Sequence, residues 1–219
     1  MLQHQNVFIK TSKHQQKTNV LNYKLEKIRS KQVSMVLIVA TIGKSGSGKT
    51  TVIEYLINKL SAESYKIGAI KHIHHRGFTI DTEGKNTWRY AKAGAKIITA
   101  ISPDEVAIIK KTSHETGSLD LAIEAMKREK LDIIFIEGYH DLAAKRADVA
   151  KIIVTADDNG LQEALCNTVK PIIAISGLIA ENSKITVIQN CPVIKIPKDG
   201  QKLVELIKHQ LSIHNGTGV

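Results

Sequence analysis

Gly43-Lys44-Ser45-Gly46-Ser47-Gly48-Lys49-Thr50-Thr51 is the stretch from which the fold class of this chain can be predicted. It matches G-x-x-x-x-G-K-[ST], the pattern of a loop that binds nucleotide phosphates. The apolar run over 36–40 precedes it and is typical of a buried parallel strand, and apolar residues at helical spacing follow it as far as Ser61. A strand, a glycine-rich loop and a helix in this order form the context that the motif requires, so we expect nucleotide phosphates to bind here.

The residue types of this loop explain its expected chemistry. Glycines allow successive backbone N–H groups to turn toward one anion, and the positive end of the helix dipole adds to that field. We expect the Lys49 ammonium group to reach the β- and γ-phosphates and the Thr50 hydroxyl to coordinate Mg²⁺. The residues predicted to hold the nucleotide in this loop are Gly43, Lys44, Ser45, Gly46, Ser47, Gly48, Lys49, Thr50 and Thr51.

Strand and helix patterns alternate along the rest of the chain. A Pro-Asp turn separates two of the predicted strands and favours a hairpin, which a short helix containing Trp88 precedes. This alternation predicts an α/β fold, a three-layer P-loop NTPase sandwich with a mainly parallel sheet. The predicted strands cover 66–70, 96–101, 106–109, 133–136, 152–154, 171–175 and 193–196, and further helices cover 119–130 and 201–213.

Two acidic residues are candidates for catalysis at the carboxyl edge of the predicted sheet, where ligands bind in folds of this kind. Glu137 directly follows the strand over 133–136, and a carboxylate in that position can bind Mg²⁺ directly or through a water molecule. Asp81 follows the loop after the strand over 66–70 and is a second candidate for the metal or its water. A solvated acid and a polar loop residue are the alternative interpretations of these two side chains.

A basic and histidine-rich segment, Lys71-His72-Ile73-His74-His75, follows the strand over 66–70 and is expected at the same edge. Three imidazoles at this spacing can bind a transition metal. Protonated in part and next to a lysine, they can instead contact an anionic ligand or a partner protein. A solvated polar loop is the third interpretation, and the sequence leaves all three open.

The net charge of +10 is concentrated at one end of the chain. Residues 1–34 hold seven Lys and Arg against one acidic residue, Glu26, so six of the ten net charges lie there. Their polar composition predicts a disordered extension, with Met35 as an alternative start and a nucleotide-binding domain over 35–215. Without these residues the charge is ordinary, which argues against nucleic-acid binding.

Composition also restricts the environment of the protein. The 42% hydrophobic content is enough for one soluble globular domain, and the sequence contains no apolar run of the roughly 18 residues that cross a bilayer. Cys166 and Cys191 lie far apart and form no CxxC pair, which argues against a disulfide framework and a structural zinc site. We therefore expect a cytoplasmic protein that does not enter a membrane.

Taken together, these motifs resemble the MobB family, the phosphate-loop GTP-binding proteins of molybdenum cofactor maturation. The resemblance covers 35–138, whereas the last third of the chain matches only in its general pattern of strands and helices and residues 1–34 match nothing in the family. The motifs that carry it are GKSGSGKTT from Gly43, AIKHIHH ending at His75, Asp81 with Gly84-Lys85, AKAGA around Gly94, and Glu137-Gly138.

The resemblance implies a GTP-binding adaptor that is at most a weak GTPase and forms a homodimer. It would assist a MobA-type molybdopterin guanylyltransferase, which attaches GMP to molybdopterin to give molybdopterin guanine dinucleotide. Carried over by position, the phosphate loop would hold GTP and Mg²⁺, with Glu137 near the metal. Lys71, His72, His74 and His75 would line the mouth of the site. The sequence contains no N-K-x-D or T-K-x-D motif, so the preference for GTP over ATP is implied by the family alone.

Two functions from other classes compete with this interpretation. A small-molecule kinase would use the same loop, but it normally has an arginine-rich lid, and the arginines of this sequence are isolated. A nickel-type metallochaperone GTPase would use His72, His74 and His75, but neither cysteine lies near them in sequence. Nucleic-acid binding would depend mostly on the basic extension.

Overall fold

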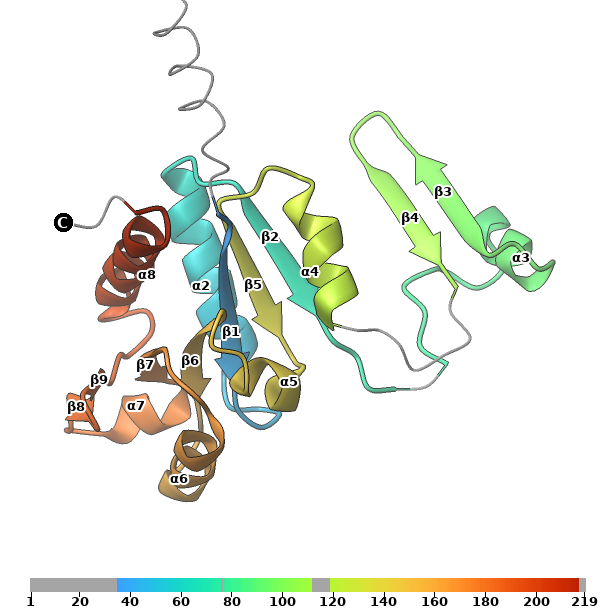
Figure 1. The fold of residues 1–219 in the computed structure, drawn as a ribbon. Coiled ribbons are helices and arrows are strands. Elements are labelled where there is room, and N and C mark those ends of the chain that lie inside the picture. The colour runs from blue at the N-terminus through green and yellow to red at the C-terminus, as the bar shows by residue number, and fades with distance from the viewer. Residues whose placement is uncertain (1–34, 76, 112–118, 217–219) are drawn as a thin grey trace, which may run out of the picture. The chain divides into compact units, whose positions relative to one another are not determined.

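Five parallel strands form the central sheet of the computed structural model, which describes residues 35–75, 77–111 and 119–216 (Figure 1). Their order across the sheet is β2-β5-β1-β6-β7, so the strand that precedes the phosphate loop is the central one. Apolar residues fill these strands because both faces of the sheet are covered. The strands are β1 (Leu37–Ile42), β2 (Ile67–Lys71), β5 (Ile133–Glu137), β6 (Ala150–Val154) and β7 (Ile172–Ser176).

Helices cover both faces of this sheet, which confirms the predicted three-layer α/β architecture. Alternate residues of β1 point to opposite sides: Val39 packs with one hydrophobic cluster and Ile38 with the other. The first cluster includes residues of α2 (Lys49–Ala62) and α8 (Gly200–His214). The second includes residues of α4 (Leu119–Lys127), α5 (His140–Ala144) and α6 (Asp158–Asn167).

Strand register places functional residues next to one another at the carboxyl edge of the sheet. Glu137 at the end of β5 is paired with Thr41 of β1 on one side and with Lys71 of β2 on the other. The phosphate loop begins immediately after β1 at Gly43. The edge that was expected to carry the site therefore carries the loop, the carboxylate and the start of the histidine-rich segment.

A separate two-stranded antiparallel sheet confirms the predicted hairpin. It consists of β3 (Ile97–Ile101) and β4 (Val106–Lys110), and α3 (Asn86–Lys92) precedes it. On one face of this hairpin, alternate apolar side chains are exposed to solvent. Their exposed fractions are 59% for Ile97, 77% for Ile101, 62% for Val106 and 67% for Ile108.

The prediction of a strand over 193–196 is wrong. The described chain there has only short pieces, α7 (Leu178–Asn182), β8 (Val187–Ile188) and β9 (Cys191–Pro192), followed by a single bridge between Val193 and Ile175. Two consecutive N–H groups bond to different segments, so no regular strand forms: the Val193 N–H donates to the Thr186 carbonyl, and the Ile194 N–H donates to the Ile175 carbonyl. The remaining strands and helices that were predicted within the described residues are present, with ends that differ by a few residues.

One charged side chain is fully buried in the sheet. Lys151, the second residue of β6, donates hydrogen bonds to the carbonyls of Arg146 at 2.7 Å and Val149 at 2.8 Å. Burial lowers the pKa of this ammonium group to about 8, against the opposing effect of Asp148. Because Lys151 lies near the amino end of β6, it is at the opposite edge of the sheet from the phosphate loop and has a structural role.

The predicted extension, residues 1–34, lies outside the described residues. In the part of the chain that the structure describes, no helix is both long enough and apolar enough to cross a membrane.

Candidate functional site

The phosphate loop connects β1 to α2 and is held in place by its own side chains and by close backbone contacts. The Ser47 hydroxyl donates to the Lys44 carbonyl at 2.9 Å, and the Lys49 ammonium group donates to the same oxygen. A Cβ atom at Gly43, where φ is +155°, would lie 1.9 Å from the Val154 carbonyl oxygen. A Cβ atom at Gly177 would lie 2.6 Å from the Ser47 carbonyl oxygen. Both positions therefore require glycine, and they pack the loop against the ends of β6 and β7.

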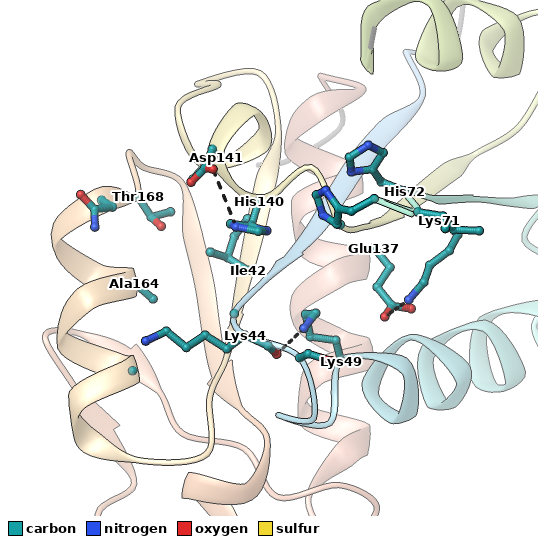
Figure 2. Close-up of a pocket in the computed structure, with 18 of the residues that line it drawn as sticks. Ile42, Lys44, Lys49, Lys71, His72, Glu137, His140, Asp141, Ala164 and Thr168 are labelled. Atoms are coloured by element: carbon teal, nitrogen blue, oxygen red, sulfur yellow. Dashed lines mark hydrogen bonds and ion pairs between the residues drawn. The ribbon is translucent and has the colours of Figure 1, made fainter. Parts of the chain in front are cut away.

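The Glu137 carboxylate is the centre of the polar contacts beside this loop. The Thr50 hydroxyl lies 3.0 Å and 3.1 Å from its two oxygens. The Lys71 ammonium group forms an ion pair with the same carboxylate (Figure 2). A backbone hydrogen bond also joins the ends of β2 and β5, since the His72 N–H donates to the Glu137 carbonyl at 2.8 Å. A hydroxyl and a carboxylate this close supply the hard oxygen ligands that Mg²⁺ prefers, so these residues fit the metal that was predicted.

Positive charge predominates at this end of the site. Burial lowers the pKa of Lys49; Glu137 acts in the opposite direction, and Lys71 lowers the pKa further. Two ammonium groups therefore face one carboxylate. An anionic ligand such as a polyphosphate would relieve the repulsion between the two lysines.

Four rings form a cluster next to Glu137. His72 stacks on Tyr139 with ring centroids 3.9 Å apart, and His74 meets His72 edge-on at 4.1 Å. The ring centroids of His140 and His74 lie 6.2 Å apart. Burial lowers the pKa of His72, with smaller contributions from His74 and His140, so the ring is neutral at pH 7.

Tyr139 and His140 belong to no motif and were not among the predicted site residues. The available signal was their position directly after Glu137-Gly138, at the carboxyl end of a central strand. Gly138 brings the two segments together, because a Cβ atom there would lie 2.7 Å from the Cβ of His72. Among the described residues, no group of three or more His, Cys, Asp or Glu side chains could hold a metal ion. This geometry disfavours the transition-metal interpretation of the histidines.

These features surround one cavity of about 820 Å³ (Figure 2). It extends from the phosphate loop and the histidine-rich segment to α5 and α6, which the sequence did not indicate. Other predicted residues, Gly46, Ser47, Gly48, Thr50 and Thr51, belong to the loop or to the start of α2 without lining the cavity. The predicted residues that line it are Gly43, Lys44, Ser45, Lys49, Lys71, His72, His74, His75 and Glu137.

Asp81 is placed differently from the other candidates. Its carboxylate accepts hydrogen bonds from the Thr82 N–H at 2.9 Å and the Thr87 hydroxyl at 2.8 Å, which stabilise the turn before α3. Its second oxygen is buried and has no hydrogen-bond partner among the described residues. Asp81 is not among the residues that line the cavity, so its catalytic role stays a prediction.

Comparisons with known proteins identify a family that matches more than half of the chain. The sequence model of the family described as molybdopterin guanine dinucleotide synthesis protein B, MobB, matches residues 38–177. The chain is 36% identical over 129 residues to the molybdopterin-guanine dinucleotide biosynthesis adapter protein of Escherichia coli K12. The aligned stretch covers 58% of this chain and 70% of that protein. It is 32% identical over 121 residues to the adapter protein of Haemophilus influenzae, covering 55% of this chain and 64% of that relative, slightly less than two thirds.

A solved structure shows the same fold. The crystal structure of Bacillus subtilis MobB aligns with a TM-score of 0.62 and 26% sequence identity, covering 80% of this chain and 97% of the other. The aligned part is thus larger than the 35–138 over which the sequence motifs were recognised.

Proposed function

Because the chain belongs to the MobB family, we propose that it is a GTP-binding adapter in molybdopterin guanine dinucleotide biosynthesis that assists a MobA-type guanylyltransferase. The observation that carries this proposal is the meeting of the phosphate loop, the Glu137 carboxylate and the Lys71 ammonium group at one end of a single cavity. This arrangement supports the binding of a nucleoside triphosphate together with Mg²⁺. The choice of GTP rests on the family.

Weak hydrolysis is the activity that the site supports. Stabilising a transferred phosphoryl group normally takes several cations around the phosphates. Lys49 and Lys71 are present, but no arginine is among the described residues that line the cavity. The site therefore favours an adapter with slow GTP turnover over a small-molecule kinase.

The histidine-rich segment supports a contact with the partner enzyme or with its anionic ligand. His74 and His75 are exposed at the mouth of the cavity, where they can touch a second molecule while the loop holds the nucleotide. His72 is tied to Tyr139 and is more buried. We therefore assign recognition to the exposed part of the segment.

The experiment for this function compares equilibrium binding of GTP and ATP with and without molybdopterin-loaded guanylyltransferase. We expect at least tenfold preference for GTP, and we expect the protein to stimulate the transferase. Replacing His74 and His75 with alanine should leave GTP affinity unchanged and remove most of the stimulation. Equal affinity for ATP would contradict the nucleotide assignment, and full stimulation by the double variant would contradict the role of the segment.

We also propose that the exposed hairpin face mediates formation of a homodimer. Ile97, Ile101, Val106 and Ile108 lie at alternate positions on one face and are each more than half exposed. A contiguous apolar face of this kind is typical of an interaction site. A second copy of the chain is the occupant that the family resemblance implies.

Replacing Ile101 with aspartate should convert the dimer into a monomer at micromolar concentration, because a charge would be buried in an apolar interface. Size-exclusion chromatography with light scattering measures this directly. Val187→Asp is the matched control, since Val187 is 56% exposed on β8, outside the hairpin. A wild-type monomer, or a variant that remains dimeric, would refute the assignment of this face.

A further inference from the structure

The Lys71 ammonium group and the Thr50 hydroxyl contact the same oxygen of one carboxylate. Both donate to Oε1 of Glu137, and the Thr50 hydroxyl lies 3.0 Å from that atom. This hydroxyl and this carboxylate are the hard oxygen ligands that fit Mg²⁺. The ammonium group of Lys71 therefore lies against an oxygen atom that would hold a metal ion (Figure 2).

An ammonium group and a divalent cation compete for such an oxygen. Mg²⁺ lies about 2.1 Å from its oxygen ligands, and a hydrogen bond places the ammonium nitrogen within about 3 Å of Oε1. An ion bound to Oε1 would thus lie within about 5 Å of a full positive charge, where repulsion is strong. Lys71 has to leave Glu137 before the carboxylate can hold the ion.

Of the two partners in this ion pair, the lysine is the one that can move. Glu137 ends β5, which lies between β1 and β2, and its side chain is only 13% exposed. Lys71 ends β2, the outermost strand on its side of the sheet, and its side chain is 55% exposed. An ion pair with one largely solvated partner contributes little to stability, so exchanging that partner costs little.

Lys49, the second cation beside Glu137, has a different hydrogen-bond partner. Its ammonium group donates to the Lys44 carbonyl in the phosphate loop, and Glu137 and Lys71 act on it through their charges. Lys49 is therefore held toward the phosphate loop, while Lys71 is held on the carboxylate. The two lysines have separate tasks although they line the same cavity.

We propose that Lys71 competes with the metal ion for the Glu137 carboxylate, so that metal alone binds weakly and the ion enters together with the nucleotide; this rests on the proposed function. Two ammonium groups and one carboxylate give this end of the cavity a net positive charge, which repels a lone dication. A triphosphate brings negative charge that attracts both the ion and the released Lys71 ammonium group. Lys71 is thus a positioning residue that holds the carboxylate until the ion replaces it.

The test measures metal binding by the full chain without nucleotide. Mn²⁺ takes the same oxygen ligands as Mg²⁺, and electron paramagnetic resonance measures the concentration of free Mn²⁺. Lys71→Met removes the ammonium group and keeps an unbranched side chain, whereas Lys71→Arg keeps the charge and the ability to pair with Glu137. Lys49→Met is the matched control, because it removes an equal charge beside the carboxylate and leaves the Lys71 contact in place.

We expect Lys71→Met to bind Mn²⁺ at least tenfold more tightly than the wild type, and Lys71→Arg to bind it no more tightly than the wild type. The gain in Lys49→Met should be at least threefold smaller than in Lys71→Met, because that variant relieves only the repulsion. The gain should disappear in the double variant Lys71→Met/Glu137→Gln, which lacks the carboxylate.

Thermal unfolding without nucleotide gives a second readout. In about 5 mM MgCl₂ the unfolding temperature of Lys71→Met should rise by about 3 °C and that of the wild type by about 1 °C or less. Unchanged or weaker Mn²⁺ binding by Lys71→Met, an equal gain in Lys49→Met, or a gain that persists in the double variant would each overturn the inference. A wild type that binds no GTP would instead refute the proposed function, while the Mn²⁺ measurements would still decide the competition for Glu137.

Discussion

Replacing Lys49 with alanine will weaken GTP binding about hundredfold. Lys49 begins α2, and its ammonium group already lies against the phosphate loop through its hydrogen bond to the Lys44 carbonyl. A hydrogen bond between charged partners contributes about 1.5–3 kcal/mol, and this lysine is placed to serve two phosphates at once. A loss of about 3 kcal/mol corresponds to roughly a hundredfold in the dissociation constant. Calorimetric titration with GTP and Mg²⁺ measures it.

The matched control for this prediction is Lys59→Ala. Lys59 lies on the same helix near its end, where it contacts the Tyr55 ring, far from the loop. The Lys59→Ala substitution removes the same charge from the protein as Lys49→Ala does, so a nonspecific effect of net charge would appear in both variants. Unchanged affinity in Lys49→Ala, with both variants folded by circular dichroism, would refute the phosphate-site assignment.

Glu137→Gln should lower Mg²⁺-dependent GTP hydrolysis about hundredfold while changing GTP affinity about threefold or less. The carboxylate contacts the Thr50 hydroxyl and Lys71, so it is placed for the metal rather than for the phosphates. Removing its charge also removes a repulsion toward the polyphosphate, which offsets part of the lost contacts. Single-turnover hydrolysis at several Mg²⁺ concentrations, compared with equilibrium binding, separates the two effects.

Glu124→Gln is the control for the carboxylate variant. Glu124 is exposed on α4, where it pairs with Lys127 at 2.9 Å, and it does not line the cavity. It should behave as the wild type in both assays. If Glu137→Gln lost hydrolysis and binding to the same extent, the residue would have a structural role at the ends of β2 and β5.

The sequence was informative where structure depends on local pattern. The phosphate loop, the strand before it and the helix after it could be predicted because glycine spacing and apolar periodicity act within a few residues. The failure over 193–196 has the same origin: apolar residues there suit a strand, but the Val193 and Ile194 N–H groups bond to different segments. No local sequence pattern shows that these two N–H groups have partners in different segments.

The contacts of the site that join distant segments could not be read in this way. Lys71 and Glu137 are 66 residues apart, and only the β2–β5 register makes them neighbours. The part of the cavity beside α5 and α6 is lined by residues of both helices, including Ala144 and Ala164, and these residues form no motif. Tyr139 and His140 likewise acquire a role only when Gly138 brings them against the histidine-rich segment.

The packing of Gly43 and Gly177 against the loop has a consequence for the kinetics of ligand capture. Both glycines fix the backbone of the loop between the ends of β6 and β7. A loop whose shape already exists loses little conformational entropy when the nucleotide binds, because its N–H groups do not have to reorient toward the anion. The association rate should then be set by diffusion and by the field of the two lysines, and differences in affinity between nucleotides should appear in how fast they leave.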